Sequence, residues 1–131
     1  MSIELTMLAY ATALLLALVV IQAVAGTLAQ GLPAMAGARD NLPPPKPFQA
    51  RALRAVDNHR EGLILFAPLI LIAAVAHVSN HLTVLGAELF FWSRLVHAAL
   101  YLLGVPWIRP LSWGVGLVGT LMVLAAVLGA S

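Results

Sequence analysis

The stretch LTMLAYATALLLALVVIQAVAGTL, residues 5–28, carries no charged side chain. It is longer than the roughly 20 residues that an α-helix needs to cross the hydrocarbon core of a bilayer. A secretory signal peptide is not expected, because Glu4 rather than a basic segment precedes the stretch and because the apolar run is too long for a signal core. The sequence therefore predicts a membrane-spanning helix over residues 4–28.

The composition extends this prediction to the whole chain. Of the 131 residues, 62% are hydrophobic and 9% are charged, which is far from the composition of soluble domains. A soluble domain of this size could not bury so much apolar surface, so lipid must be the solvent for much of it. The absence of cysteine excludes disulfides and thiolate metal sites. No basic run with interleaved aromatic residues occurs, so no nucleic-acid partner is expected.

Three further apolar runs predict helices over residues 48–78, 82–105 and 110–130. Before the first of them, residues 31–47 are rich in proline and glycine and predict an irregular loop. The two later links are short, which favours antiparallel neighbours. The predicted fold class is all-α: a single domain, residues 1–131, that forms a multi-pass integral membrane four-helix bundle.

Lysine and arginine gather on one side of this predicted bundle. The first and third loops, with the helix ends beside them, hold Arg39, Lys46, Arg51, Arg54 and Arg109. The second loop and both ends of the chain hold neither lysine nor arginine. The positive-inside rule therefore places the first and third loops in the cytoplasm and both termini outside it.

Two polar stripes lie on the predicted second and third helices. Arg54, Asn58 and Glu61 stand at positions i, i+4 and i+7, so they share one helix face, which Arg51 extends by a turn. The second stripe, at i, i+3 and i+7, comprises Arg94, His97 and Tyr101. A charge at membrane depth is costly and normally faces a partner or a polar cavity. We expect a cationic, hydrogen-bonding pocket at the cytoplasmic end of the bundle, open sideways to lipid.

Structural explanations compete with this functional one. Arg51, Arg60 and Arg109 lie near helix ends, where long cationic side chains reach the interface without any further role. Glu61 and Arg94 together suit an inter-helix salt bridge that serves conformational specificity alone.

Other residue types indicate less. Three histidines show no metal-ligand spacing with an acidic motif, so no metal is expected: His59, His77 and His81. Four glycines are expected to permit close approach of helices rather than to mark a nucleotide site: Gly26, Gly114, Gly116 and Gly119.

The run RAVDNHRE, residues 54–61, resembles the second-helix signature of the MAPEG superfamily, the membrane-associated proteins in eicosanoid and glutathione metabolism. The run RLVHAALY, residues 94–101, and the following GVPWIR, residues 104–109, are also similar to that family. The resemblance covers essentially the whole chain, as one MAPEG-like transmembrane domain of the short bacterial type. It implies a protein of a bacterial inner membrane.

The same resemblance implies a homotrimer that binds glutathione between adjacent subunits near the cytoplasmic face. Matched by position, the glutathione-binding residues are Arg51, Arg54, Asn58, Glu61, Arg94, His97 and Tyr101. Arg109 matches the arginine that is proposed to stabilise the glutathione thiolate in family enzymes, and it is the expected catalytic residue. A nearby guanidinium favours thiolate over thiol, and the thiolate is the nucleophile.

Two functions from different classes remain open. The first is a glutathione-dependent transferase or peroxidase, whose partners are membrane lipid and a hydrophobic electrophile or lipid hydroperoxide. The retained Arg54, Asn58, Glu61 and Arg109 favour it. The second is a non-catalytic membrane scaffold or lipid-binding protein with the same fold. Residues 22–30 favour it, because they hold no arginine where family enzymes that use glutathione tend to carry one.

Overall fold

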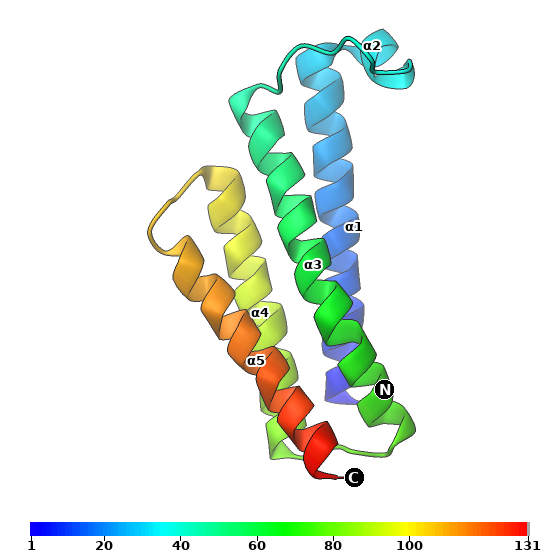
Figure 1. The fold of residues 1–131 in the computed structure, drawn as a ribbon, viewed down its shortest axis with the longest axis vertical. Helices are drawn as coiled ribbons and strands as arrows, with labels where there is room; N and C mark the ends of the chain where they lie inside the picture. The colour runs from blue at the N-terminus through cyan, green and yellow to red at the C-terminus, as the bar shows by residue number, and fades with distance from the viewer. Residues whose placement is uncertain (131) are drawn as a thin grey trace.

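The described part of the chain, residues 1–130 of a computed structural model, consists of helices joined by turns and loops (Figure 1). Its helices, in chain order, are α1 (Ile3–Gln30), α2 (Leu32–Ala36), α3 (Pro47–Val75), α4 (His81–Leu103) and α5 (Arg109–Gly129). These residues form no strand, so the predicted all-α fold is confirmed. The four long helices lie side by side, and helices that follow one another along the chain run in opposite directions (Figure 1).

The two ends of the bundle differ in what they carry. Both termini and the α3–α4 turn lie at one end, whereas α2 and the α4–α5 turn lie at the other (Figure 1). The second end is therefore the one that holds Arg39, Lys46 and Arg109, and we call it the basic end. The charge asymmetry that the sequence predicted is thus a property of the folded bundle.

The packing divides the bundle into two helix pairs. Contact is most extensive between α4 and α5 and next between α1 and α3, while α4 also contacts α1 and α3. The pairs are joined by an apolar core in which the rings of Phe66 on α3 and Phe90 on α4 stack with 3.9 Å between centroids. Met7 and Ala11 of α1 and Val123 of α5 complete this core, so all four long helices share it.

Glycine sets the distance between α4 and α5. A Cβ atom on Gly119 would lie 2.5 Å from the carbonyl oxygen of Gly86, and one on Gly116 would lie 2.9 Å from Ser93 Oγ. At these two positions the expected close approach of helices is confirmed. Gly114 plays no such part, because a Cβ there would meet nothing within 4 Å, and Gly26 approaches the Met35 side chain of α2 instead.

Local signals explain both ends of α4. The Asn80 side chain caps α4 by accepting from the backbone N–H groups of Leu82 and Thr83. Gly104 then ends α4 in the left-handed conformation, with φ of 75°, which a residue without a Cβ adopts at little cost.

Two features of the chain differ from the prediction. The helix expected over residues 48–78 ends at Val75, and His77 then adopts a left-handed φ of 57°. The loop expected to be irregular contains α2, which begins after Gly31 with Pro33 in its first turn. A five-residue helix has no apolar periodicity to reveal it, and its Met35 packs against Gly26 of α1 only in the folded chain.

Of the helices that the structure describes, three are long and apolar enough to cross a membrane: α1, α3 and α5. The remaining long helix, α4, has 23 residues but carries Glu88, Arg94 and His97, which lower its hydropathy. Arg94 and His97 are buried against the other helices, so these two polar groups face inward, whereas Glu88 is only partly buried. The chain is therefore an integral membrane protein by length and composition.

The charge asymmetry predicts a topology that labelling can test. Because the chain holds no cysteine, single cysteines introduced at Ala38 and Ala130 give unambiguous labels. We expect the cysteine at Ala38 to react from the cytoplasmic side and that at Ala130 from the opposite side, because the positive-inside rule predicts that the basic end faces the cytoplasm. Labelling of both positions from one side with a membrane-impermeant maleimide would refute this arrangement.

Candidate functional site

Three predicted site residues meet at the basic end, one from each of three helices. The ring of Tyr101 on α4 contacts the guanidinium groups of Arg54 on α3 and Arg109 on α5, whose central carbons are 5.8 and 4.6 Å from its centroid. We call these residues the arginine–tyrosine cluster. A cation over an aromatic face is attracted by the negative charge density of the ring. One tyrosine thus holds two like-charged side chains at one place.

Neither arginine of the cluster is neutralised by a carboxylate. Within residues 1–130 the one ion pair joins Arg60 and Asp57, both on the exposed surface of α3, at 2.7 Å. The cluster therefore presents net positive charge at the end of the bundle. Guanidinium groups in this state favour carboxylate or phosphate ligands, which they bind in a bidentate manner.

A hydrogen-bonded turn fixes the start of α5 and with it Arg109. The Ser112 hydroxyl donates to the carbonyl oxygen of Arg109 at 2.9 Å, and His97 Nδ1 lies 3.1 Å from both the Ser112 Oγ and that carbonyl oxygen. Because the serine proton is already donated, both oxygens face Nδ1 as acceptors, so the neutral imidazole carries its proton on Nδ1. Its Nε2 is buried and has no hydrogen-bond partner among residues 1–130. His97 thus positions the Arg109 backbone rather than contacting its guanidinium.

A second group of polar residues links α3 and α4 deeper in the bundle. Arg94, only 3% exposed, donates from Nη2 to Asn58 Oδ1 at 2.8 Å, and its Nε lies 3.5 Å from His59 Nδ1. The other ring nitrogen of His59 lies 2.8 Å from the carbonyl oxygen of Ala11, which brings α1 into the network. A buried cation is tolerable here because neutral acceptors satisfy part of its hydrogen-bonding capacity.

The salt bridge considered between Glu61 and Arg94 is absent from the described residues. Arg94 pairs with Asn58 instead, and Glu61 is exposed. Both charged side chains nevertheless line one small cavity of about 40 Å³, together with Asn58, Gly62 and Trp113. The carboxylate of Glu61 therefore remains accessible beside the buried guanidinium.

Arg51 is the predicted site residue that stands apart. Its Nε donates to the carbonyl oxygen of Leu102 at 3.1 Å, and its guanidinium lies 5.7 Å from the ring centroid of Phe48. It therefore ties the beginning of α3 to the end of α4, and within residues 1–130 no hydrogen bond, ion pair or cation–π contact joins it to the arginine–tyrosine cluster.

Two residues that form these hydrogen bonds were not among the predicted site residues: His59, which contacts Arg94, and Ser112, which bonds to the Arg109 carbonyl. His59 is fully buried between Val56 and Leu63, so its position in the apolar stripe of α3 was the available signal. Ser112 stands three residues after Arg109, a spacing at which a side chain returns to a backbone carbonyl in a first helical turn. In the part of the chain that the structure describes, no three His, Cys, Asp or Glu side chains are placed to hold a metal ion.

Comparison with known proteins identifies the family. No curated protein and no solved structure matches the chain. The model of the MAPEG family matches residues 6–129, which is nearly the whole chain and includes every residue of the arginine–tyrosine cluster and of the Arg94 network. The chain therefore belongs to the MAPEG family.

Proposed function

We propose that this protein is a membrane-bound glutathione-dependent transferase or peroxidase that acts on hydrophobic electrophiles or lipid hydroperoxides. The observation that carries the proposal is the pair of guanidinium groups on Tyr101, which no carboxylate neutralises in residues 1–130. Glutathione supplies two carboxylates, an ammonium group and a thiol, and the basic end offers matching groups. Membership of the MAPEG family supports the same ligand class.

The chemistry of each side chain suggests its role. Arg54 and Arg51 suit the ligand's carboxylates, because their charge is unpaired and bidentate contact is available to a guanidinium. Glu61 suits the ammonium group, since its exposed carboxylate has no ion-pair partner in residues 1–130. Arg94 holds Asn58 at the edge of the same small cavity. Arg109 is assigned to the thiolate, which its positive charge stabilises.

A neighbouring subunit is needed to complete such a site. The cavity that Glu61, Asn58 and Arg94 line holds about 40 Å³, whereas ligand sites commonly enclose about 300–1,000 Å³. This small cavity cannot enclose a tripeptide, and we propose that a homotrimer closes the site between subunits. The hydrophobic substrate then enters from the bilayer, and the basic end of a bacterial inner-membrane protein faces cytoplasmic glutathione.

Glutathione binding to the detergent-purified protein tests the proposal, with isothermal titration calorimetry as the measurement. We expect Arg54→Gln to weaken binding by about tenfold, because a charge-assisted hydrogen bond contributes about 1.5–3 kcal/mol. Arg60→Gln is the matched control, since Arg60 is an exposed arginine of the same helix that pairs with Asp57 outside the cluster. The Arg60→Gln variant is expected to bind glutathione with the same affinity as the unmodified protein.

Other outcomes separate the alternatives. If the unmodified protein binds no glutathione, the enzymatic function fails and a non-catalytic scaffold or lipid-binding function takes its place. Equal losses in Arg54→Gln and Arg60→Gln would show general electrostatic attraction instead of a built site. A stable monomer in native mass spectrometry, with glutathione bound, would contradict the shared site.

A further inference from the structure

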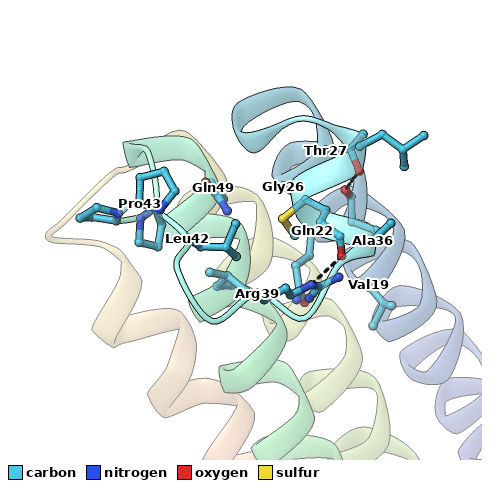
Figure 2. A pocket seen from close by; sticks show the side chains of 15 residues that line it. Val19, Gln22, Gly26, Thr27, Ala36, Arg39, Leu42, Pro43 and Gln49 are labelled. Carbon is cyan, nitrogen blue, oxygen red and sulfur yellow. Dashed lines mark hydrogen bonds between the residues drawn. The ribbon is translucent and has the colours of Figure 1, made fainter.

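A cavity of about 650 Å³ lies at the basic end, on the side of α1 that α2 and the proline-rich loop cover. Its walls come from α1, α2, the loop and the start of α3 (Figure 2). Most of its lining is apolar, including Val19, Ala23, Met35, Leu42 and Leu53. The arginine–tyrosine cluster contributes no residue to this lining, so the cavity is separate from the proposed glutathione site.

One cation lines this apolar cavity, and no acidic residue does. Arg39 donates from Nε to the Met35 carbonyl oxygen at 2.7 Å, and its two Nη nitrogens have no partner in residues 1–130. Its backbone adopts a left-handed φ of 66°, a conformation that costs free energy for any residue with a Cβ. The loop thus turns this guanidinium towards Gln22 and Val19 of α1 (Figure 2).

Gln22 supplies a second unused polar group. Its side chain lines the cavity, and no hydrogen bond joins its amide to another of the described residues. By contrast, Thr27 and Gln49, which also line the cavity, already bond to the Ala23 carbonyl and to Gln30. A ligand in the cavity can therefore bond to the guanidinium of Arg39 and to the amide of Gln22, both at the edge of an apolar space.

The length of α1 places this edge at the level of the lipid head groups. Its 28 residues span about 42 Å, which exceeds the hydrocarbon core of about 30 Å. The polar residues Gln22, Thr27 and Gln30 all lie in its last third, so that end extends beyond the hydrocarbon. An occupant must therefore combine an oxyanion at the interface with an apolar chain.

We infer that this cavity binds an anionic glycerophospholipid of the surrounding leaflet. The phosphate oxygens accept hydrogen bonds from the Nη groups of Arg39, and a glycerol hydroxyl or ester oxygen bonds to the Gln22 amide. One acyl chain lies along Val19 and Ala23. Guanidinium groups match phosphate geometry in a bidentate manner, and basic pockets at helix ends are a recognised form of lipid site. The bound lipid joins α2 and the loop to α1.

Native mass spectrometry in mild detergent tests the inference without glutathione, with phosphatidylglycerol and phosphatidylcholine of the same acyl chains as probes. We expect Arg39→Gln to weaken binding of the first phosphatidylglycerol by about tenfold or more, whereas Lys46→Gln changes it by less than about twofold. Lys46 is the matched control, because it lies in the same loop and carries the same charge but does not line the cavity. Phosphatidylcholine is expected to bind more weakly than phosphatidylglycerol.

A second variant tests the acyl chain independently. Ala23 is exposed in the cavity wall, so Ala23→Phe fills the space without disturbing the helix core, and we expect it to abolish the first phosphatidylglycerol site. Equal weakening by Arg39→Gln and Lys46→Gln overturns the inference, as does unchanged binding in Ala23→Phe. Tighter Arg39-dependent binding of palmitate than of phosphatidylglycerol overturns the phospholipid assignment. A change of oligomeric state in Ala23→Phe overturns it in favour of a second copy of the chain.

Discussion

Replacing Gly119 with alanine is expected to lower the free energy of unfolding of the bundle by about 2–3 kcal/mol. The added Cβ would lie 2.5 Å from the carbonyl oxygen of Gly86 and 2.9 Å from the backbone nitrogen of Phe90. Both are backbone atoms of a helix, so no side-chain rotation relieves the overlap, and α4 and α5 must separate. Separation loosens the most extensive helix contact in the structure.

The same substitution at Gly114 is the control for this experiment. Gly114 lies on the same helix, and a Cβ there meets nothing within 4 Å, so Gly114→Ala keeps the packing and gains helix propensity of at most about 1 kcal/mol. Denaturation of both variants in mixed micelles, followed by circular dichroism, measures the difference. Equal stabilities would mean that the Gly86–Gly119 approach does not limit the distance between the helices.

The long helices could be predicted because lipid imposes simple constraints on them. A run without charge, such as residues 5–28, has to satisfy its backbone internally, and in hydrocarbon only a helix or a closed barrel does so. The short helix α2 could not be predicted, because Gly31 and Pro33 are also typical of loops. The contact of Met35 with Gly26 depends on how the loop folds back over α1.

For the candidate site, the sequence could predict which side chains share a helix face, but not which of them contact the facing helix. Spacing placed Arg54, Asn58 and Glu61 on one face, and the structure brings Asn58 to Arg94. Spacing cannot tell which side chain of a stripe meets the facing helix. In the structure, Asn58 accepts the hydrogen bond from Arg94, whereas Glu61 lines the same cavity without forming an ion pair within residues 1–130.

Residues whose hydrogen-bond partners lie on other helices were harder to predict. His59 carries no neighbouring acidic residue within its helix face, and its partners, Ala11 and Arg94, come from α1 and α4. The role of Arg109 was available from the family resemblance, whereas its support by His97 and Ser112 required the geometry of the α4–α5 turn. Contacts between elements far apart in the sequence leave no local pattern.

The largest expected effect on chemistry belongs to Arg109→Ala. Under the proposed function, this variant should lower turnover by about tenfold or more and raise the pKa of the bound glutathione thiol towards that of free glutathione. The reason is that a cation beside sulfur acts on the thiolate that forms, whereas contacts to the carboxylates of glutathione already exist in the ground state. Losing the stabilisation of the thiolate lowers kcat, and losing a contact to a carboxylate of glutathione raises KM.

The structure makes this test specific to the guanidinium. The backbone of Arg109 is held by Ser112 and His97, so removing its side chain leaves the start of α5 in place. Thiolate absorbance in the ultraviolet, measured with glutathione bound near neutral pH, should fall in Arg109→Ala and persist in Arg109→Lys, which keeps the charge. Arg60→Ala controls for the loss of an arginine elsewhere on the surface. A thiolate signal that is unchanged in Arg109→Ala would remove Arg109 from the mechanism and leave Arg54 as the cation of the cluster to be tested next.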